Sequence, residues 1–383
     1  MRARLASTAT AILLALASAC DEGGGDAGAD ARAWPPRTRL FVAGSGEARL
    51  HVFDLETLER VSTIAVPSGP GEVHATPDGR FVWAVSREAG VLAIVDPETL
   101  GVAREVPLGA RPTHSYVEPG YARVWVGNDG SGDVSVVELA SGAEERVLTG
   151  NGHHKMAMVT GADGALRFVY ASNLADGTIS VLAPGPALVT NVGVGPAPHG
   201  MDYAAGTGRV YSCSGDAEQS VELLAPDAGH AVVSRVPLPA RCGYLEVHGG
   251  EAFATLGSAG LLARIDLETE EVATFAAGEA PDKLAIAGDR AFVSNVTTPT
   301  VTVVDLAGGP SRSVEVGAAV VRDGRGHRGL LLFGDRLFVP NEADGTVSVI
   351  DVETEAVIAT LEGIVAPAGI AVAGPGVGTT HPR

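Results

Sequence analysis

The chain alternates apolar and polar positions in short runs that are separated by turn residues. The segment 337–363, LFVPNEADGTVSVIDVETEAVIATLEG, shows this pattern most clearly. Its residues 346–352 alternate apolar and polar side chains, which predicts a strand with one buried and one exposed face. The Asp344-Gly345 pair in front favours a tight hairpin turn, because both residue types tolerate positive φ. We therefore expect strands at 337–339, 346–352 and 357–361, preceded by an almost wholly apolar strand at 329–333.

The same strand–turn–strand pattern recurs about eight times, roughly 40 residues apart, which is the period of a four-stranded propeller blade. The copies begin at Phe41, Phe81, Val124, Phe168, Val210, Ala252, Ala291 and Leu337. The sequence therefore predicts an all-β, eight-bladed β-propeller, with seven blades as the alternative.

The two ends of the repeat region are expected to share one blade. Residues 39–66 contain only the three outer strands of a blade, whereas residues 365–373, VAPAGIAVA, have the pattern of an inner strand with no blade behind it. A C-terminal strand that joins the N-terminal blade closes the ring and removes open sheet edges. We assign a single propeller domain to residues 37–373 and a short, loose tail to residues 374–383.

The repeated core, present as FVPNEADGTVSVID from Phe338, resembles the YVTN-repeat β-propeller family of secreted and periplasmic proteins. The resemblance covers nearly all of the chain after Arg37. It implies the fold and an exported location, but it does not imply one activity, because a single fold hosts many functions.

The first 19 residues have the features of an export signal peptide. Arg2 and Arg4 precede an apolar stretch at 11–16 that is too short to span a bilayer. The following A-S-A-C segment resembles a bacterial lipoprotein box, which implies lipidation of Cys20, although an ordinary signal peptidase would also accept it. Residues 20–36 are rich in Gly and Asp and predict a flexible tether. We expect a protein of the periplasm or cell surface that touches a membrane only through a lipid anchor.

The composition limits the possible partners. The chain has 27 Lys and Arg against 46 Asp and Glu, a formal net charge of −19. This charge argues against nucleic acid and anionic lipid surfaces as partners. It is compatible with cationic partners, although solubility alone also explains it. We expect a monomer with a protein or small-ligand partner that the charge does not identify.

The candidate chemistry is confined to the turns in front of the inner strands, which surround one mouth of the axial channel in a propeller. Their histidines are His74, His114, His153, His154, His199 and His327. Their other polar residues are Arg111, Lys155, Asp282, Lys283 and Arg328. His114, His154 and His199 come from three consecutive blades, so we expect their imidazoles to converge. Three imidazoles with an open fourth position would suit zinc or copper.

Several interpretations of this ring stay open. Its axial histidines resemble those of the copper-bearing propeller of nitrous oxide reductase and of periplasmic zinc-carrier propellers, which implies a metal carrier or metalloenzyme. The eight-blade ring also resembles the haem-binding propeller of nitrite reductases. The basic side chains instead suit a small anion. Pro-His-Gly turns also occur in YVTN repeats as plain turn chemistry, which leaves a non-catalytic binding scaffold, acting through the axial mouth, as the primary interpretation. The sequence has no GxSxG nucleophile elbow, and we assign no catalytic residue.

Two cysteines remain after the leader. Cys213 ends the second strand of the fifth blade and Cys242 begins the first strand of the sixth, so antiparallel pairing places both at the same mouth. We predict a disulfide, with two small buried side chains or two metal ligands beside His199 as the alternatives.

Two further groups of residues are interpreted without a functional role. His51, His230, His248 and His381 are expected to lie on the surface. Residues 128–133, NDGSGD, are interpreted as a hairpin turn, because they lack the distal Glu of a calcium-binding loop.

Overall fold

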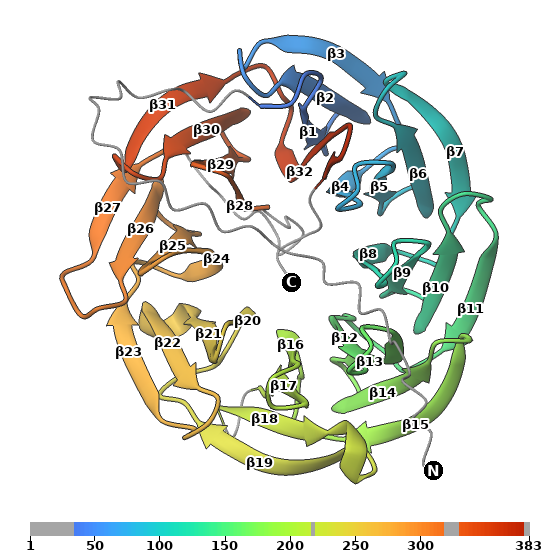
Figure 1. Ribbon diagram of the computed structural model, residues 1–383, viewed down its shortest axis with the longest axis vertical. Coiled ribbons are helices and arrows are strands. Elements are labelled where there is room, and N and C mark those ends of the chain that lie inside the picture. The colour runs from blue at the N-terminus through green and yellow to red at the C-terminus, as the bar shows by residue number, and fades with distance from the viewer. Residues whose placement is uncertain (1–33, 216–218, 318–328, 379–383) are drawn as a thin grey trace, which may run out of the picture. The chain divides into compact units, whose positions relative to one another are not determined.

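The computed structural model describes residues 34–215, 219–317 and 329–378. The described residues form eight antiparallel sheets arranged in a ring (Figure 1). The prediction of an all-β, eight-bladed propeller is therefore confirmed. Compact packing of this part of the chain begins at Trp34.

Each blade has four main strands, which are given below from the axis outward. Blade 1 contains β32 (Pro367–Gly374), β1 (Arg39–Gly44), β2 (Arg49–Asp54) and β3 (Arg60–Ala65). Blade 2 contains β4 (Pro70–Ala75), β5 (Val82–Ser86), β6 (Val91–Asp96) and β7 (Gly101–Pro107). Blade 3 contains β8 (Pro112–Val117), β9 (Arg123–Asn128), β10 (Asp133–Glu138) and β11 (Glu144–Leu148). Blade 4 contains β12 (Met156–Thr160), β13 (Leu166–Asn173), β14 (Thr178–Ala183) and β15 (Ala187–Gly193).

The second half of the ring repeats this order. Blade 5 contains β16 (Met201–Ala204), β17 (Arg209–Cys213), β18 (Ser220–Ala225) and β19 (Ala231–Pro237). Blade 6 contains β20 (Leu245–His248), β21 (Glu251–Leu256), β22 (Leu261–Asp266) and β23 (Val272–Ala276). Blade 7 contains β24 (Pro281–Ala287), β25 (Arg290–Asn295), β26 (Thr300–Asp305) and β27 (Arg312–Glu315). Blade 8 contains β28 (Leu331–Phe333), β29 (Arg336–Asn341), β30 (Thr346–Asp351) and β31 (Ala356–Leu361). The short 3₁₀ turns η1 (Pro226–Ala228) and η2 (Gly257–Ala259) follow β18 and β21.

The ring closes as predicted, because β32 pairs with β1 in an antiparallel register that runs from Arg39↔Ala373 to Gly44↔Pro367. The predicted loose tail is only partly correct. Val377–Gly378 forms β33, which pairs with β32 as a fifth strand of the first sheet. The remaining tail residues, 379–383, lie outside the described residues.

The hydrophobic core is divided among the interfaces between neighbouring blades. One cluster joins blades 5 and 6 through residues such as Tyr211 and Ala254, and another joins blades 8 and 1 through Phe338 and Val42. The second of these clusters lies across the closure, so the last and first blades pack together like any other pair. Burial of this apolar surface is the main source of stability in such a fold.

The repeated Asn at the end of the second strand explains the sequence motif. Asn173 Nδ2 donates hydrogen bonds to Thr178 Oγ1 and Ser180 Oγ, each at 2.9 Å. Asn128 and Asn295 donate in the same way to side chains five and seven residues later. Each Asn therefore fixes the hairpin of its own blade through side-chain hydrogen bonds.

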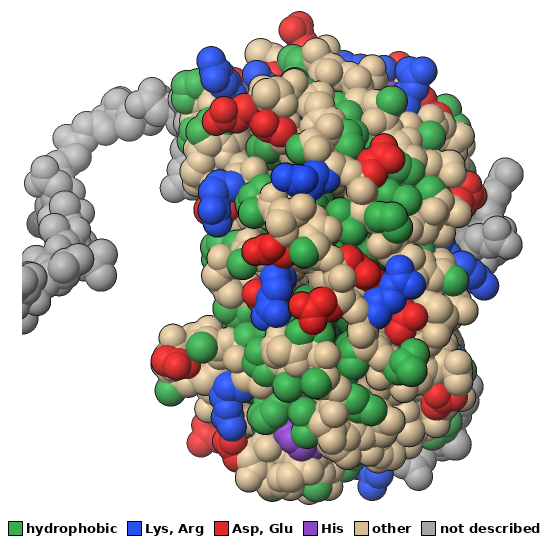
Figure 2. All heavy atoms as spheres, turned by 90° about the vertical axis from the view of Figure 1, so that its right-hand side faces the viewer, with side chains coloured by type: hydrophobic (Ala, Val, Ile, Leu, Met, Phe, Trp, Pro, Cys, Tyr) green, Lys and Arg blue, Asp and Glu red, His purple; other side chains and the backbone are tan. Residues whose placement is uncertain are grey.

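The outer face of the ring mixes charges. Figure 2 shows acidic and basic side chains interspersed over the side that carries β7 and β11. None of the helical turns in the described segments is long and apolar enough to cross a bilayer.

Candidate functional site

Two histidines from neighbouring blades meet at the axial mouth. His114 lies on β8, and His153 lies in the turn that leads into β12. Their Nε2 atoms are 2.7 Å apart, and their rings are nearly perpendicular, with centroids separated by 4.4 Å. His114 is almost fully buried, whereas the His153 side chain is 18% exposed. The pair is therefore reachable from the mouth on the His153 side.

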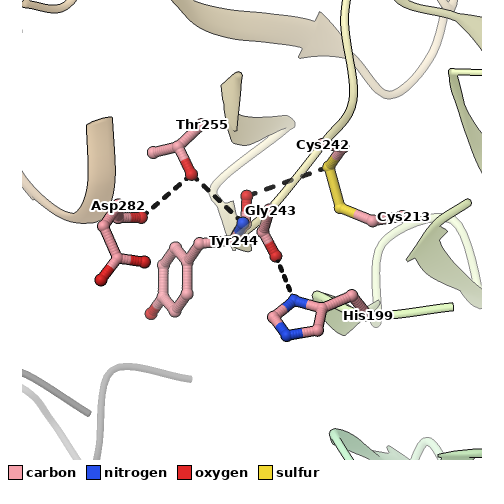
Figure 3. The surroundings of a disulfide bond; sticks show 7 residues. All are labelled: His199, Cys213, Cys242, Gly243, Tyr244, Thr255 and Asp282. Atoms are coloured by element: carbon pink, nitrogen blue, oxygen red, sulfur yellow. Dashed lines mark hydrogen bonds between the residues drawn. A yellow bond between two sulfur atoms is a disulfide. The ribbon is translucent and has the colours of Figure 1, made fainter. Parts of the chain in front are cut away.

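A third histidine stacks on this pair. The His199 ring, just before β16, lies nearly parallel to the His153 ring, with centroids 5.2 Å apart. His199 Nδ1 contacts the Gly243 carbonyl oxygen at 2.5 Å (Figure 3). The backbone N–H of His199 donates to the Cys213 carbonyl at 3.1 Å. Blade 6 and the second strand of blade 5 thus fix the orientation of this imidazole. We call His114, His153 and His199 the axial imidazole cluster.

The structure shows that the histidine from blade 4 in this cluster is His153 and not the predicted His154. His154 was expected to converge with His114 and His199, but its Nε2 lies 3.0 Å from both Thr149 Oγ1 and the Gly150 carbonyl oxygen, inside the blade. Successive side chains of an extended segment point to opposite sides, so only one of two neighbouring histidines can face the axis. A Cβ at Gly127 would lie 2.6 Å from His154 Cβ, so the glycine makes room for this ring.

The disulfide lies next to the cluster. Cys213 and Cys242 are bonded, with Cα atoms 5.4 Å apart, and they join blades 5 and 6. Cys213 supplies the carbonyl that binds the His199 N–H, and Gly243 follows Cys242 directly. The bond therefore connects the two backbone segments that hold His199 (Figure 3).

Glu72 on β4 binds the cluster from blade 2. Its carboxylate contacts His114 Nδ1, lies 3.0 Å from His74 Nε2 and accepts a hydrogen bond from the Ser115 N–H at 3.1 Å. The residue is only 5% exposed. Gly369 on β32 lets this strand approach, because a Cβ there would lie 2.5 Å from Glu72 Cα.

Asp129 contacts the Nδ1 atom of His153, as Glu72 contacts that of His114. The carboxylate lies in the turn after β9, with Oδ2 at 3.1 Å from His153 Nδ1 and 3.2 Å from Arg87 Nη1. Burial alone would raise the pKa of Asp129, but hydrogen bonds from His153 and His154 hold the pKa well below its usual range. Asp129 is therefore an anion that orients the His153 ring.

Sequence reasoning missed both acids as site residues. Glu72 stands two residues before His74 in the same inner strand, and Asp129 belongs to the segment that was interpreted as a hairpin turn. The one indication in the sequence was that each acid stands close to the predicted mouth. The sequence alone did not show that these acids cross to a neighbouring blade.

Two buried lysines lie beside the imidazoles. Lys155 Nζ is 3.3 Å from His114 Nδ1, and burial together with the charge of Lys283 lowers the pKa of Lys155 to about 7. Lys283 Nζ donates to Asp282 Oδ1 at 3.0 Å and lies 4.9 Å from the centroid of the Tyr244 ring. The expected Lys155, Asp282 and Lys283 are thus gathered near the axis.

The remaining predicted residues are more scattered. Arg111 is exposed on the rim, and His74 lies one step deeper, against Glu72. His327, Arg328 and Cys20 lie outside the described residues, as does His381.

His51 and His230 were expected on the surface, but they are buried: His51 contacts Glu47 at 2.8 Å, and His230 Nδ1 lies 2.5 Å from the Tyr170 hydroxyl. His248 is exposed, as expected.

The three axial imidazoles are neutral near pH 7. Burial lowers the pKa of His114 well below its ordinary value, lowers that of His153, and brings that of His199 to about 3. In each ring Nδ1 has an acceptor: the Glu72 carboxylate, the Asp129 carboxylate or the Gly243 carbonyl. These acceptors favour the tautomer with the proton on Nδ1, which leaves a lone pair on Nε2. Within the described segments, no group of three His, Cys, Asp or Glu side chains is already arranged as a metal site.

The buried carboxyl group of Glu246 predicts that the stability of the fold depends on pH. Glu246 on β20 is mostly buried, and burial together with the negative charge of Asp202 raises its pKa to about 8, from 4.5. The folded chain therefore keeps a proton that the unfolded chain releases between pH 4.5 and about 8, so this contribution to stability is lost as the pH rises through that window.

We expect Glu246→Gln to gain stability relative to the wild type as the pH rises through this window, because Gln stays neutral. Urea unfolding midpoints measured near both ends of the window check this prediction. An equal difference between the two proteins at both pH values would contradict it.

Comparison with known proteins supports the fold and little else. No protein-family model matches the sequence. One curated relative, the 6-phosphogluconolactonase of Cronobacter sakazakii (strain ATCC BAA-894), is 30% identical over 117 residues, which cover 29% of this chain. The match spans only 35% of that relative's length.

Two solved structures share the architecture. Dihydro-heme d1 dehydrogenase NirN, in complex with DHE, superposes with a TM-score of 0.69 at 16% identity, over 89% of this chain and 76% of that chain. AztD from Citrobacter koseri gives a TM-score of 0.68 at 14% identity, over 90% and 98% of the two chains. Identities this low establish a common fold alone.

Proposed function

We propose that this chain is a non-catalytic binding propeller of the cell envelope, of the YVTN-repeat type, which holds one zinc or copper ion at its axial mouth. The ligands are the Nε2 atoms of His114, His153 and His199. The observation that carries the proposal is the pairing of all three Nδ1 atoms with acceptors. Histidines that bind metals almost always donate their second ring N–H to a carboxylate or a backbone carbonyl.

The contact between His114 and His153 supports a cation in particular. With both protons on Nδ1, the two Nε2 lone pairs face each other at 2.7 Å. This arrangement is repulsive unless a cation binds both atoms. A proton is poorly retained there near pH 7, because burial lowers the pKa of both rings. A metal ion is the remaining cation that neutral imidazoles favour.

Three imidazole nitrogens are suitable ligands for zinc or copper, but the distance between two of them has to increase when the ion binds. Two imidazoles on tetrahedral zinc, with bonds of about 2.0–2.1 Å, hold their nitrogens roughly 3.3 Å apart. The His114–His153 separation of 2.7 Å therefore has to widen on binding. The partly exposed His153 is the ring that can move, because His114 is buried against Glu72 and Lys155.

A small anion is less well supported as the ligand. Lys283 is already paired with Asp282 at 3.0 Å, and Lys155 lies against His114. The Lys155 pKa of about 7 further reduces its positive charge near neutral pH. The basic groups at the axis thus offer little uncompensated charge to an anion.

The exported location is part of the proposal. A disulfide is stable in oxidising compartments such as the periplasm, and the Cys213–Cys242 bond is consistent with that environment. We propose that the leader directs export and that Cys20 carries the lipid anchor.

Calorimetric titration of the chain with Zn²⁺ and Cu²⁺ tests the metal site. We expect one ion per chain. We expect His153→Ala to lower the affinity by more than the roughly 10- to 100-fold caused by losing a residue that only hydrogen-bonds to a metal ligand. His248→Ala is the matched control, because His248 is exposed on β20, away from the cluster. Equal affinities of the wild type and the His153→Ala variant would refute the site.

A further inference from the structure

A cavity runs along the inner strands of blades 2 to 5 toward the end of the channel that lies away from the axial imidazole cluster. It has a volume of about 400 Å³ and is bordered by the turns that follow the inner strands of blades 2 to 5. Pro77, Gly120, Gly164 and Ala205 mark these turns. The inner strands start at the histidine-bearing mouth, so residues beyond their other ends lie at the far face.

Four aromatic side chains contribute to the walls of this cavity. Trp83, Tyr116, Tyr121 and Tyr203 line it, together with the thioether of Met158. The polar atoms of two of these aromatic side chains already donate hydrogen bonds to protein groups. Trp83 Nε1 donates to Ser115 Oγ at 3.0 Å, and the Tyr203 hydroxyl donates to the Thr160 carbonyl at 3.2 Å. Trp83 is only 1% exposed, so the ring surface offered to a ligand comes mainly from the partly exposed Tyr116, Tyr121 and Tyr203.

The charge in the cavity is negative. Asp202 lines it, and its two oxygens are fixed by backbone N–H groups of Tyr203 and Val247, both at 2.8 Å. The other lining acid, Glu118, is paired with Arg123 at 2.7 Å. None of the described residues that line the cavity is a lysine or an arginine. His74, which contacts Glu72, also lines the cavity. Asp202 therefore contributes a negative charge to a wall that holds no lysine or arginine.

We propose that this cavity binds an organic ammonium ion with an apolar body. The positive charge is attracted to aromatic ring faces and to Asp202, and the apolar body packs against Met158 and the rings. The volume lies within the range of small-molecule sites, which combine an apolar lining with a few placed polar groups. An anion would meet the carboxylate of Asp202 in a wall that holds no lysine or arginine.

A charge series on the full chain tests this proposal. Benzyltrimethylammonium, phenethyl alcohol and phenylacetate carry a phenyl group with a positive, a neutral or a negative end. We expect the cation to bind at least about 10-fold more tightly than the alcohol, and phenylacetate to bind most weakly. Titration followed by NMR or by tryptophan fluorescence measures the three affinities, because Trp83 lies in the wall.

Two variants in the cavity wall and one outside it locate the site. Asp202→Asn is expected to weaken cation binding about 10-fold while leaving the alcohol nearly unaffected. Met158→Trp fills the cavity from a partly exposed position and is expected to weaken all probes. His199→Ala, in the axial imidazole cluster, is expected to leave the cation affinity unchanged. Binding of the alcohol or of phenylacetate as tightly as the cation, or no saturable binding of the cation in the millimolar range, would overturn the proposal.

Discussion

Glu72→Ala is expected to lower the free energy of unfolding by about 3–5 kcal/mol, because each buried donor that loses its acceptor costs about 1–3 kcal/mol. Glu72 is 5% exposed and receives contacts from His114, His74 and the Ser115 N–H. Its negative charge also favours the charged form of the buried Lys155. Without the carboxylate, buried donors from two blades lose their shared acceptor. Chemical denaturation followed by tryptophan fluorescence measures the loss.

Two controls separate this role from a general effect of removing an acid. Glu72→Gln keeps the side-chain shape and one carbonyl acceptor, so we expect a smaller loss of stability. It should still weaken metal binding roughly 10- to 100-fold, because His114 Nδ1 loses its carboxylate. Glu88→Ala removes an exposed acid from the same blade and is expected to change stability little. A Glu72→Ala variant as stable as Glu88→Ala would contradict the structural account.

Removing the disulfide is expected to have the second largest effect. The Cys213→Ala, Cys242→Ala double variant should lose roughly 3 kcal/mol of stability, because the bond closes a loop with a sequence separation of 29 residues. We also expect weaker metal binding, because Cys213 and the residue after Cys242 supply the two carbonyls that hold His199. Reduction of the wild type should reproduce both changes.

The two outcomes can be read separately. Unfolding in denaturant reports the stability of the variant, and a metal titration below the unfolding transition reports the geometry around His199. A double variant that loses stability but binds metal like the wild type would contradict the role of the disulfide in positioning His199. An unchanged unfolding midpoint would contradict its role in the fold.

Most of the fold could be predicted from the sequence, because each blade repeats the same local information. The Asn at the end of the second strand and the hydroxyl residues five and seven positions later define one hairpin, as Asn173, Thr178 and Ser180 show. The closure by β32 also followed from the pattern, since an inner strand without its own blade has one free edge to pair with. The two-residue strand β33 did not follow, because two residues carry no periodicity.

The arrangement of the site could be predicted only in part. The sequence placed histidines from consecutive blades at one mouth, but it did not show which of His153 and His154 faces the axis. That choice depends on the register of the segment before β12 and on the space that Gly127 leaves for His154. Glu72 and Asp129 were missed for a related reason. Their partners lie 42 and 24 residues away, in the next blade, and no local spacing encodes such a contact.

X-ray absorption spectroscopy of the metal-loaded chain tests the central claim most directly, because it reports the number and type of ligand atoms around the ion. We predict three imidazole ligands at about 2.0–2.1 Å for zinc in the wild type, and two in the His153→Ala variant at saturating metal. A wild-type spectrum without imidazole ligands, or one that is identical in the His153→Ala variant, would contradict the account.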